Sequence, residues 1–238
     1  MEIPFIFQSI DLVTKIIALY DAPSDTKFKD VIEVTPNKKN CIFQFYNDWQ
    51  EVKTLKLTKT SYGCGGCGTW LFGQSSRTKE GLIDFLFETE KLRHSRILMA
   101  EFANKAKTYS PKFDAIFIGE LDERFNEYVK TITIFANPDQ VSILQHAFNY
   151  YFGGDENPFI IEFGSGCMQM LNIIEKYDTP KAILGGLDFA SRGYIPRNYF
   201  AITMNKEMYD LISKIDENSF LTTSFFKSFK KMRQGSLS

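Results

Sequence analysis

The four cysteines are the residues whose type and spacing offer the clearest chemistry. Cys64 and Cys67 lie in a glycine-rich stretch, SYGCGGCGTW, and the other two are Cys41 and Cys167. Two residues between cysteines let both sulfurs reach one metal ion at about 2.3 Å, and the glycines free backbone N–H groups to point at thiolates. A tetrahedral set needs two more ligands, so we expect Cys41 and Cys167 to complete a zinc or iron–sulfur site.

Two other interpretations of Cys64 and Cys67 remain open from the sequence. A Cys-x-x-Cys pair that opens a helix can have a lowered thiol pKa and act as a redox dithiol. Cysteines can also pack as small, inert hydrophobic side chains within a glycine turn. A Cys–His catalytic pair is disfavoured because the two histidines, His94 and His146, lie in a charged run and within a predicted helix. Catalytic residues therefore stay unassigned.

A second constellation suggests binding of an anion. Gly164, Ser165 and Gly166 form a glycine turn between a predicted strand and a predicted helix, where backbone N–H groups meet the positive end of the helix. Asp188 and Arg192 follow another glycine turn at a spacing that allows an ion pair. Arg192 could instead hold a carboxylate or phosphate through two hydrogen bonds. The alternative function is therefore a non-catalytic protein that binds a small anionic molecule.

The overall composition is that of an ordinary globular protein. A chain of 238 residues, 44% of them hydrophobic, predicts one domain, with a weak boundary near residue 110. The net charge of −1 disfavours a nucleic-acid binder. No apolar run approaches the ~20 residues that span a bilayer, so we expect no membrane partner. The sequence leaves the oligomeric state open.

The first residues, MEIPF, lack the basic and apolar regions of a secretory leader. We therefore expect a cytoplasmic protein in a reducing compartment. There a Cys-x-x-Cys pair favours metal or redox chemistry over a structural disulfide.

Hydrophobic periodicity predicts an α+β fold with a mixed or antiparallel sheet flanked by helices. We expect the sheet to come from the second half of the chain, with the helices and glycine loop of the first half packed against it. Predicted helices cover 8–20, 41–52, 79–107 with a break near 94, 138–151, 166–176, 206–215 and 219–232. Predicted strands cover 31–34, 55–58, 113–118, 131–135, 159–163, 182–184 and 200–203.

An internal echo links two of these regions. Residues 134–139 and 202–207 each contain the end of a strand, an asparagine and an acidic residue in the first turn of a helix. Asn137 and Asn205 would cap those helices, and the acidic residues would complement the helix dipoles. The echo fits either an internal strand–helix duplication or convergent capping.

Four segments in the second half resemble one known family. They are FANPDQVS at 135–142, FGSGC at 163–167, GLDFASR at 186–192 and ENSFL at 217–221. In this order they resemble the uncharacterised family called domain of unknown function 169, or ArCR, which is found in bacteria and archaea. The resemblance spans roughly residues 30–230 and is most specific after residue 131. It implies a cytosolic protein without an assigned reaction and draws attention to Cys167, Asp188 and Arg192.

Overall fold

The structure, a computed structural model, describes residues 3–34, 41–43, 53–154 and 156–235. Its strands are β1 (Ile17–Ala22), β2 (Val31–Glu33), β3 (Thr54–Thr58), β4 (Ala115–Glu120), β5 (Val129–Ala136), β6 (Phe159–Ile160), β7 (Ala182–Gly185) and β8 (Phe200–Asn205). Its α-helices are α1 (Phe5–Ser9), α2 (Gly65–Phe72), α3 (Lys79–Asp84), α4 (Arg96–Lys105), α5 (Pro138–Asn149), α6 (Gly166–Lys176), α7 (Phe189–Arg192), α8 (Lys206–Ile212) and α9 (Ser224–Gly235).

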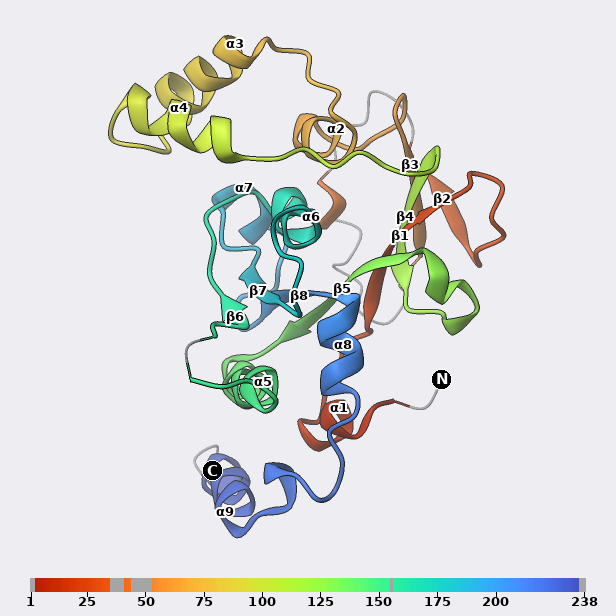
Figure 1. Ribbon diagram of the computed structural model, residues 1–238, viewed down its shortest axis with the longest axis vertical. Coiled ribbons are helices and arrows are strands. Elements are labelled where there is room, and N and C mark those ends of the chain that lie inside the picture. Colours follow the sequence, from red (N-terminus) through yellow and green to blue (C-terminus); the bar gives the residue numbers. More distant parts are fainter. Residues whose placement is uncertain (1–2, 35–40, 44–52, 155, 236–238) are drawn as a thin grey trace.

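The strands form one mixed sheet in the order β2-β3-β4-β1-β5-β8-β7-β6. Within it, β2 pairs in parallel with β3 and β6 with β7, while the other neighbours are antiparallel. Helices lie on both sides of the sheet, and the α3–α4 hairpin projects from one end (Figure 1). This arrangement confirms the predicted α+β class with a mixed sheet.

The helix predicted over 8–20 is wrong. Helix α1 ends at Ser9, Asp11 takes a left-handed conformation with φ of 52°, and strand β1 begins at Ile17. Every residue of β1 is buried because this strand lies in the middle of the sheet and is covered on both faces. The helical spacing came mostly from apolar residues before β1, one of which, Val13, is exposed, and a strand buried on both faces lacks the apolar–polar alternation that would have revealed it.

The first half of the chain therefore contributes strands as well as helices. Strands β1, β2 and β3 precede residue 110, yet β1 pairs with β4 and β5, which follow it. The expectation that the second half alone builds the sheet is thus corrected. Of the helix predicted over 41–52, residues 44–52 lie outside the described part of the chain, and Ile42 and Phe43 form a short 3-10 turn.

Alternating side chains divide the core into two layers. On one face of the sheet, Tyr20 and Phe117 pack with residues of α1, α5, α8 and α9. On the other face, Leu19 and Ile118 pack with residues of α2 and α6. We call this second side the cysteine face because Cys67 and Cys167 belong to its core.

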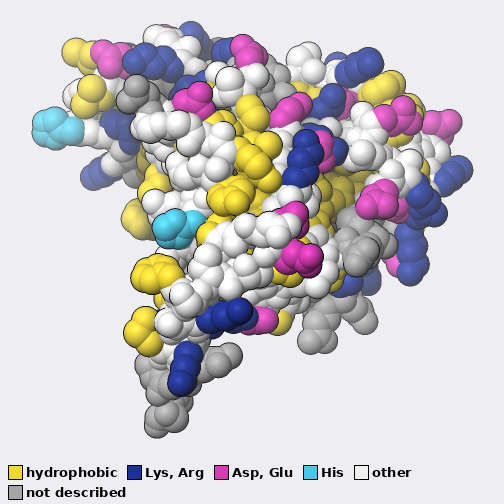
Figure 2. Space-filling model, turned by 60° about the horizontal axis from the view of Figure 1, so that its bottom comes forward, with side chains coloured by type: hydrophobic (Ala, Val, Ile, Leu, Met, Phe, Trp, Pro, Cys, Tyr) yellow, Lys and Arg dark blue, Asp and Glu magenta, His cyan; other side chains and the backbone are white. Residues whose placement is uncertain are grey.

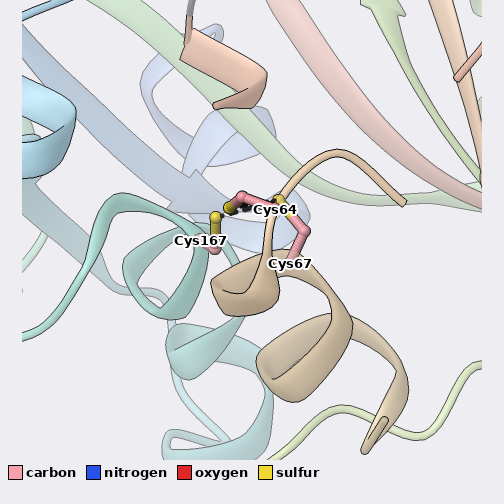
Figure 3. Close-up of side chains that lie close together, drawn as sticks. All are labelled: Cys64, Cys67 and Cys167. Atoms are coloured by element: carbon pink, nitrogen blue, oxygen red, sulfur yellow. Dashed lines mark hydrogen bonds between the residues drawn. The ribbon is translucent and has the colours of Figure 1, made fainter. Parts of the chain in front are cut away.

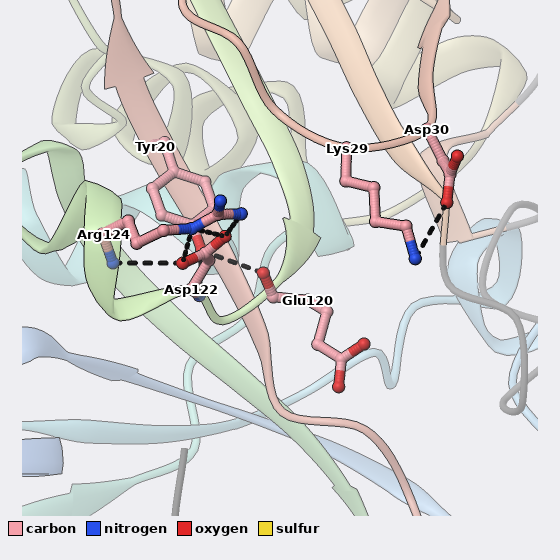
Figure 4. Close-up of polar contacts among 6 residues, drawn as sticks. All are labelled: Tyr20, Lys29, Asp30, Glu120, Asp122 and Arg124. Carbon is pink, nitrogen blue, oxygen red and sulfur yellow. Dashed lines mark hydrogen bonds and ion pairs between the residues drawn. The ribbon is translucent and has the colours of Figure 1, made fainter.

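Polar contacts of Tyr20 connect β1 to the end of β4 and to the turn that follows it. The Tyr20 hydroxyl donates to the carbonyl of Glu120 at 2.9 Å and accepts the backbone N–H of Asp122 at 2.8 Å (Figure 4). Burial raises the pKa of Tyr20, so the phenol keeps its proton. The Asp122 carboxylate pairs in turn with Arg124, which fixes the turn after β4.

The fully buried Asp21 side chain organises the segment before β4. Its carboxylate accepts hydrogen bonds from the Tyr109 hydroxyl at 2.7 Å and from the backbone N–H groups of Lys112 and Phe113 at 2.6 and 2.9 Å. Three donors offset much of the cost of burying one carboxylate. Residues 109–113 are thereby held against the centre of the sheet.

The internal echo has a structural counterpart. Asn137 accepts the N–H of Gln140 at 2.9 Å, and Asn205 accepts the N–H of Met208 at 3.1 Å, so both residues cap helices as expected. Strands β5 and β8 are antiparallel neighbours, and Ile134 stands directly opposite Ile202. These two isoleucines occupy equivalent positions of the echo. A local two-fold relation between the strand–helix units would give this register.

No helix in the described ranges combines the length and apolar character needed to cross a bilayer. On the face drawn in Figure 2, acidic and basic side chains are interspersed and form no continuous basic surface.

Replacing Asp21 with alanine should lower the free energy of unfolding by about 2–4 kcal/mol, because one buried and two partly buried donors lose their acceptor. Urea denaturation checks this value. The matched control is Asp25→Ala at an exposed position, which should change stability by less than about 0.5 kcal/mol. Equal stabilities of the two variants would contradict the structural role of Asp21.

Candidate metal centre

Three of the four cysteines meet on the cysteine face. Cys64 is the N-cap of α2, Cys67 lies in the first turn of α2, and Cys167 lies in the first turn of α6. Their Sγ atoms are 3.6 Å apart for Cys64 and Cys67, 3.2 Å apart for Cys67 and Cys167, and all within 4.8 Å of one another (Figure 3). Cys67 and Cys167 are buried, whereas Cys64 is partly exposed. We call this group the cysteine triad.

Glycines let the two helices and their neighbours approach the triad. A Cβ on Gly166, next to Cys167, would lie 2.1 Å from the Phe43 ring and 2.6 Å from Ser191 Oγ. A Cβ on Gly68, next to Cys67, would lie 2.4 Å from the Tyr62 ring. The ring of Phe43 therefore packs directly over the start of α6.

Polar contacts fix the turn that carries Cys167. Ser165 caps α6 by accepting the Met168 N–H at 3.4 Å. The Gly166 N–H donates to Asp188 Oδ2 at 2.9 Å and to Ser191 Oγ at 3.1 Å. These bonds join the loops that follow the parallel strands β6 and β7, and they hold the start of α6 in one orientation.

The triad sulfurs have very different proton affinities. Hydrogen bonding to Cys167 and Cys67, with further bonds from the backbone N–H groups of Cys67 and Gly66, lowers the pKa of Cys64 well below its usual range. The pKa of Cys167 is raised by its contacts with Cys64 and Cys67 and by burial. For Cys67 the contact with Cys167 acts to lower the pKa, but the contact with Cys64 and burial outweigh it and raise the pKa. The pKa of Cys64 is thus shifted in the opposite direction from those of Cys67 and Cys167.

Cys41 lies in the same region but outside the three-sulfur group. It is partly exposed and packs against the core of the cysteine face, two residues before Phe43. Since Phe43 lies over Gly166, the segment 41–43 reaches the start of α6. Its role as a fourth ligand stays a prediction.

The residues predicted to bind an anion make contacts within the protein. Gly164 packs near the Met168 side chain, and the contacts of Ser165 and Gly166 are described above. Asp188 caps α7 by accepting the Ser191 N–H at 2.9 Å. The two Nη atoms of Arg192 donate to the carbonyls of Tyr199 at 2.5 Å and Arg197 at 2.6 Å, which holds the loop before β8. Asp188 and Arg192 thus act on different neighbours and show no ion pair with each other.

Sequence reasoning did not identify three residues that shape this region. Phe43 and Ser191 contact Gly166, and Gln169 accepts the Gly186 N–H at 2.8 Å while donating to the Glu162 carbonyl at 2.7 Å. Phe43 makes its contact across more than a hundred residues, which no local pattern reveals. The two histidines, His94 and His146, are exposed and do not belong to the triad.

Comparison with known proteins gives one match. The family model DUF169, described as Uncharacterised ArCR, matches residues 6–214. No curated protein matches the chain, and no solved structure does.

Replacing Gly166 with alanine should lower the free energy of unfolding by about 1–3 kcal/mol, because the new Cβ overlaps the Phe43 ring. The matched variant Gly65→Ala adds a Cβ that meets nothing within 4 Å. It should be neutral or stabilising by up to about 1 kcal/mol, since alanine favours helix. Thermal unfolding compares the two, and equal effects would refute the close packing at Gly166.

The lowered pKa of Cys64 predicts reactivity at acidic pH. A thiol with an ordinary pKa near 8.5 is almost fully protonated at pH 5, whereas Cys64 stays a thiolate there. In chelator-treated protein, a haloacetamide should label Cys64 at pH 5 at least about tenfold faster than the same cysteine in urea, as peptide mass spectrometry measures. Equal rates in the folded and unfolded chains would show that the pKa is not lowered.

Proposed function

Because the chain belongs to the DUF169 family of uncharacterised ArCR proteins, we propose its function from its own cysteine centre. The protein binds zinc or an iron–sulfur cluster through Cys64, Cys67 and Cys167, with Cys41 as the fourth ligand. The centre serves a redox or sensing role.

The observation behind this proposal is the spacing of the three sulfurs. Thiolates around a tetrahedral zinc ion with bonds of about 2.3 Å lie about 3.8 Å from one another. The triad distances of 3.6 and 3.2 Å are close to that value. Small rotations of the side chains would therefore suffice to bring all three sulfurs to one ion, although Cys64 and Cys167 lie far apart in the sequence.

The charge of the site suits an anionic metal–thiolate complex. The three triad thiolates around a divalent ion have a net charge of −1, and Cys41 as a fourth thiolate makes it −2. The sulfurs sit at the N-terminal ends of α2 and α6, and each such end has a positive charge of about half a unit. Two helix ends thus offset about one unit of this negative charge.

The fourth ligand decides which role the centre has. A fourth cysteine closes the coordination shell, as in structural zinc sites and cysteine-ligated iron–sulfur clusters. Three cysteines alone leave a position for water or a small ligand. The position of segment 41–43 beside α6 supports Cys41 as that fourth ligand.

The decisive measurement uses protein purified without oxygen and without a chelating tag. Visible absorption, iron, zinc and acid-labile sulfide are recorded on one sample. Iron with sulfide near stoichiometry indicates a cluster and an electron-transfer or sensing role, and zinc alone indicates a structural or Lewis-acid site. A metal-free protein with four titratable thiols would refute the proposal.

Cysteine variants then define the ligands. Cys64→Ser, Cys67→Ser and Cys167→Ser should each reduce metal content at least about tenfold, since loss of one thiolate opens the shell. Gly65→Ala, which leaves every sulfur in place, should retain the metal. Cys41→Ser should reduce metal content to the same degree if Cys41 is the fourth ligand, and full retention would show a three-cysteine site.

A further inference from the structure

We propose that the metal-free triad reduces hydroperoxides and closes a disulfide between Cys64 and Cys67. This inference rests on the proposed function only in that metal and oxidant compete for the same sulfurs. The chemistry itself needs the thiols alone.

Access assigns the first step to Cys64. It is the partly exposed member of the triad, while Cys67 and Cys167 are buried. Among the described residues, none lies within 4 Å of a Cβ built on the neighbouring Gly65, so this part of the structure leaves space at the end of α2. A Cβ on Gly66 would lie 3.6 Å from the Cys64 sulfur and 3.9 Å from the Trp70 ring, so a larger residue at this position would crowd the sulfur.

Proximity assigns the second step to Cys67. Its sulfur is 3.6 Å from that of Cys64, and the two residues are the N-cap and a first-turn residue of the same helix, α2. A bond between them needs no movement of one helix against another. Cys167 is closer to Cys67, at 3.2 Å, but both of those side chains are buried and neither offers a peroxide an exposed sulfur.

The reaction balances as a two-electron oxidation. The Cys64 sulfur attacks one oxygen of the peroxide, the O–O bond breaks, and a sulfenic acid forms while the other oxygen leaves as hydroxide and takes up a proton. The Cys67 sulfur then attacks the Cys64 sulfur, the S–O bond breaks, and water leaves. The two thiols are oxidised to one disulfide, and hydrogen peroxide is reduced to two molecules of water.

The oxidised protein, with its Cys64–Cys67 disulfide, cannot bind a metal ion as the reduced triad would. A disulfide removes two of the three thiolates, so Cys167 alone of the triad remains as a ligand. Peroxide therefore converts a metal-binding centre into one that binds weakly, and a dithiol reductant reverses the change.

The test treats chelator-treated, fully reduced protein with stoichiometric hydrogen peroxide. Thiol titration should show the loss of two thiols, and peptide mass spectrometry should show a disulfide that joins Cys64 and Cys67. Cys64→Ser should slow thiol loss at least about tenfold. Asp25→Ala, an exposed position outside the triad, should react at the rate of the unmodified protein.

Two further variants identify the partner of Cys64. Cys67→Ser should accumulate a sulfenic acid on Cys64 that dimedone traps, because the thiol at the same helix end is gone and Cys167 belongs to another helix. Cys167→Ser should still form the disulfide. A disulfide that joins Cys67 and Cys167, or an undiminished rate in Cys64→Ser, would overturn the proposal.

The outcome is separable from that of the proposed function. A protein that binds zinc but is inert to peroxide overturns this inference alone. A protein that forms the Cys64–Cys67 disulfide, but contains no metal after purification and binds none when metal is added, overturns the proposed function alone. Loss of zinc binding after peroxide treatment, restored by dithiothreitol, supports both.

Discussion

The convergence of two helix starts on one small group of sulfurs is the constraint on which the rest of this structure depends. Helices α2 and α6 both begin at the triad, so backbone N–H groups and positive helix ends surround the sulfurs. The approach leaves no room for a side chain at Gly166, where Phe43 and Ser191 already lie. The positive helix ends and the close packing at Gly166 therefore both act on the surroundings of the three triad sulfurs.

The sheet supplies the rigid support for that convergence. Every strand residue of β1 is buried, and Asp21 and Tyr20 extend hydrogen bonds from it to the segments on either side of β4. Helix α6 packs over β5, β7 and β8 and against α2. The cysteines can thus stand close together because the elements beneath them do not shift independently.

The sequence predicted those parts that depend on local patterns. The Asn137 and Asn205 caps, the helix after the FGSGC turn, and the pairing of Cys64 with Cys67 all follow from neighbours in the chain. Strand β1 was missed because burial on both faces removes alternation. Cys167 was predicted to join the pair from its residue type alone. Its place beside Phe43 and Ser191 is a long-range packing result that no spacing encodes.

The distance along the chain between Cys67 and Cys167 has a consequence for biosynthesis. The contact spans 100 residues, and it exists only after β4, β5 and α6 have been made and the sheet has closed. A chain still on the ribosome can offer an ion no more than the local Cys64–Cys67 pair from this triad. An ion that binds all three sulfurs would therefore bind after folding, and it would cross-link a long loop, which in the chain-entropy estimate for covalent links is worth about 4–5 kcal/mol. A complete metal centre would thus mark a chain that has been made and folded at least through α6.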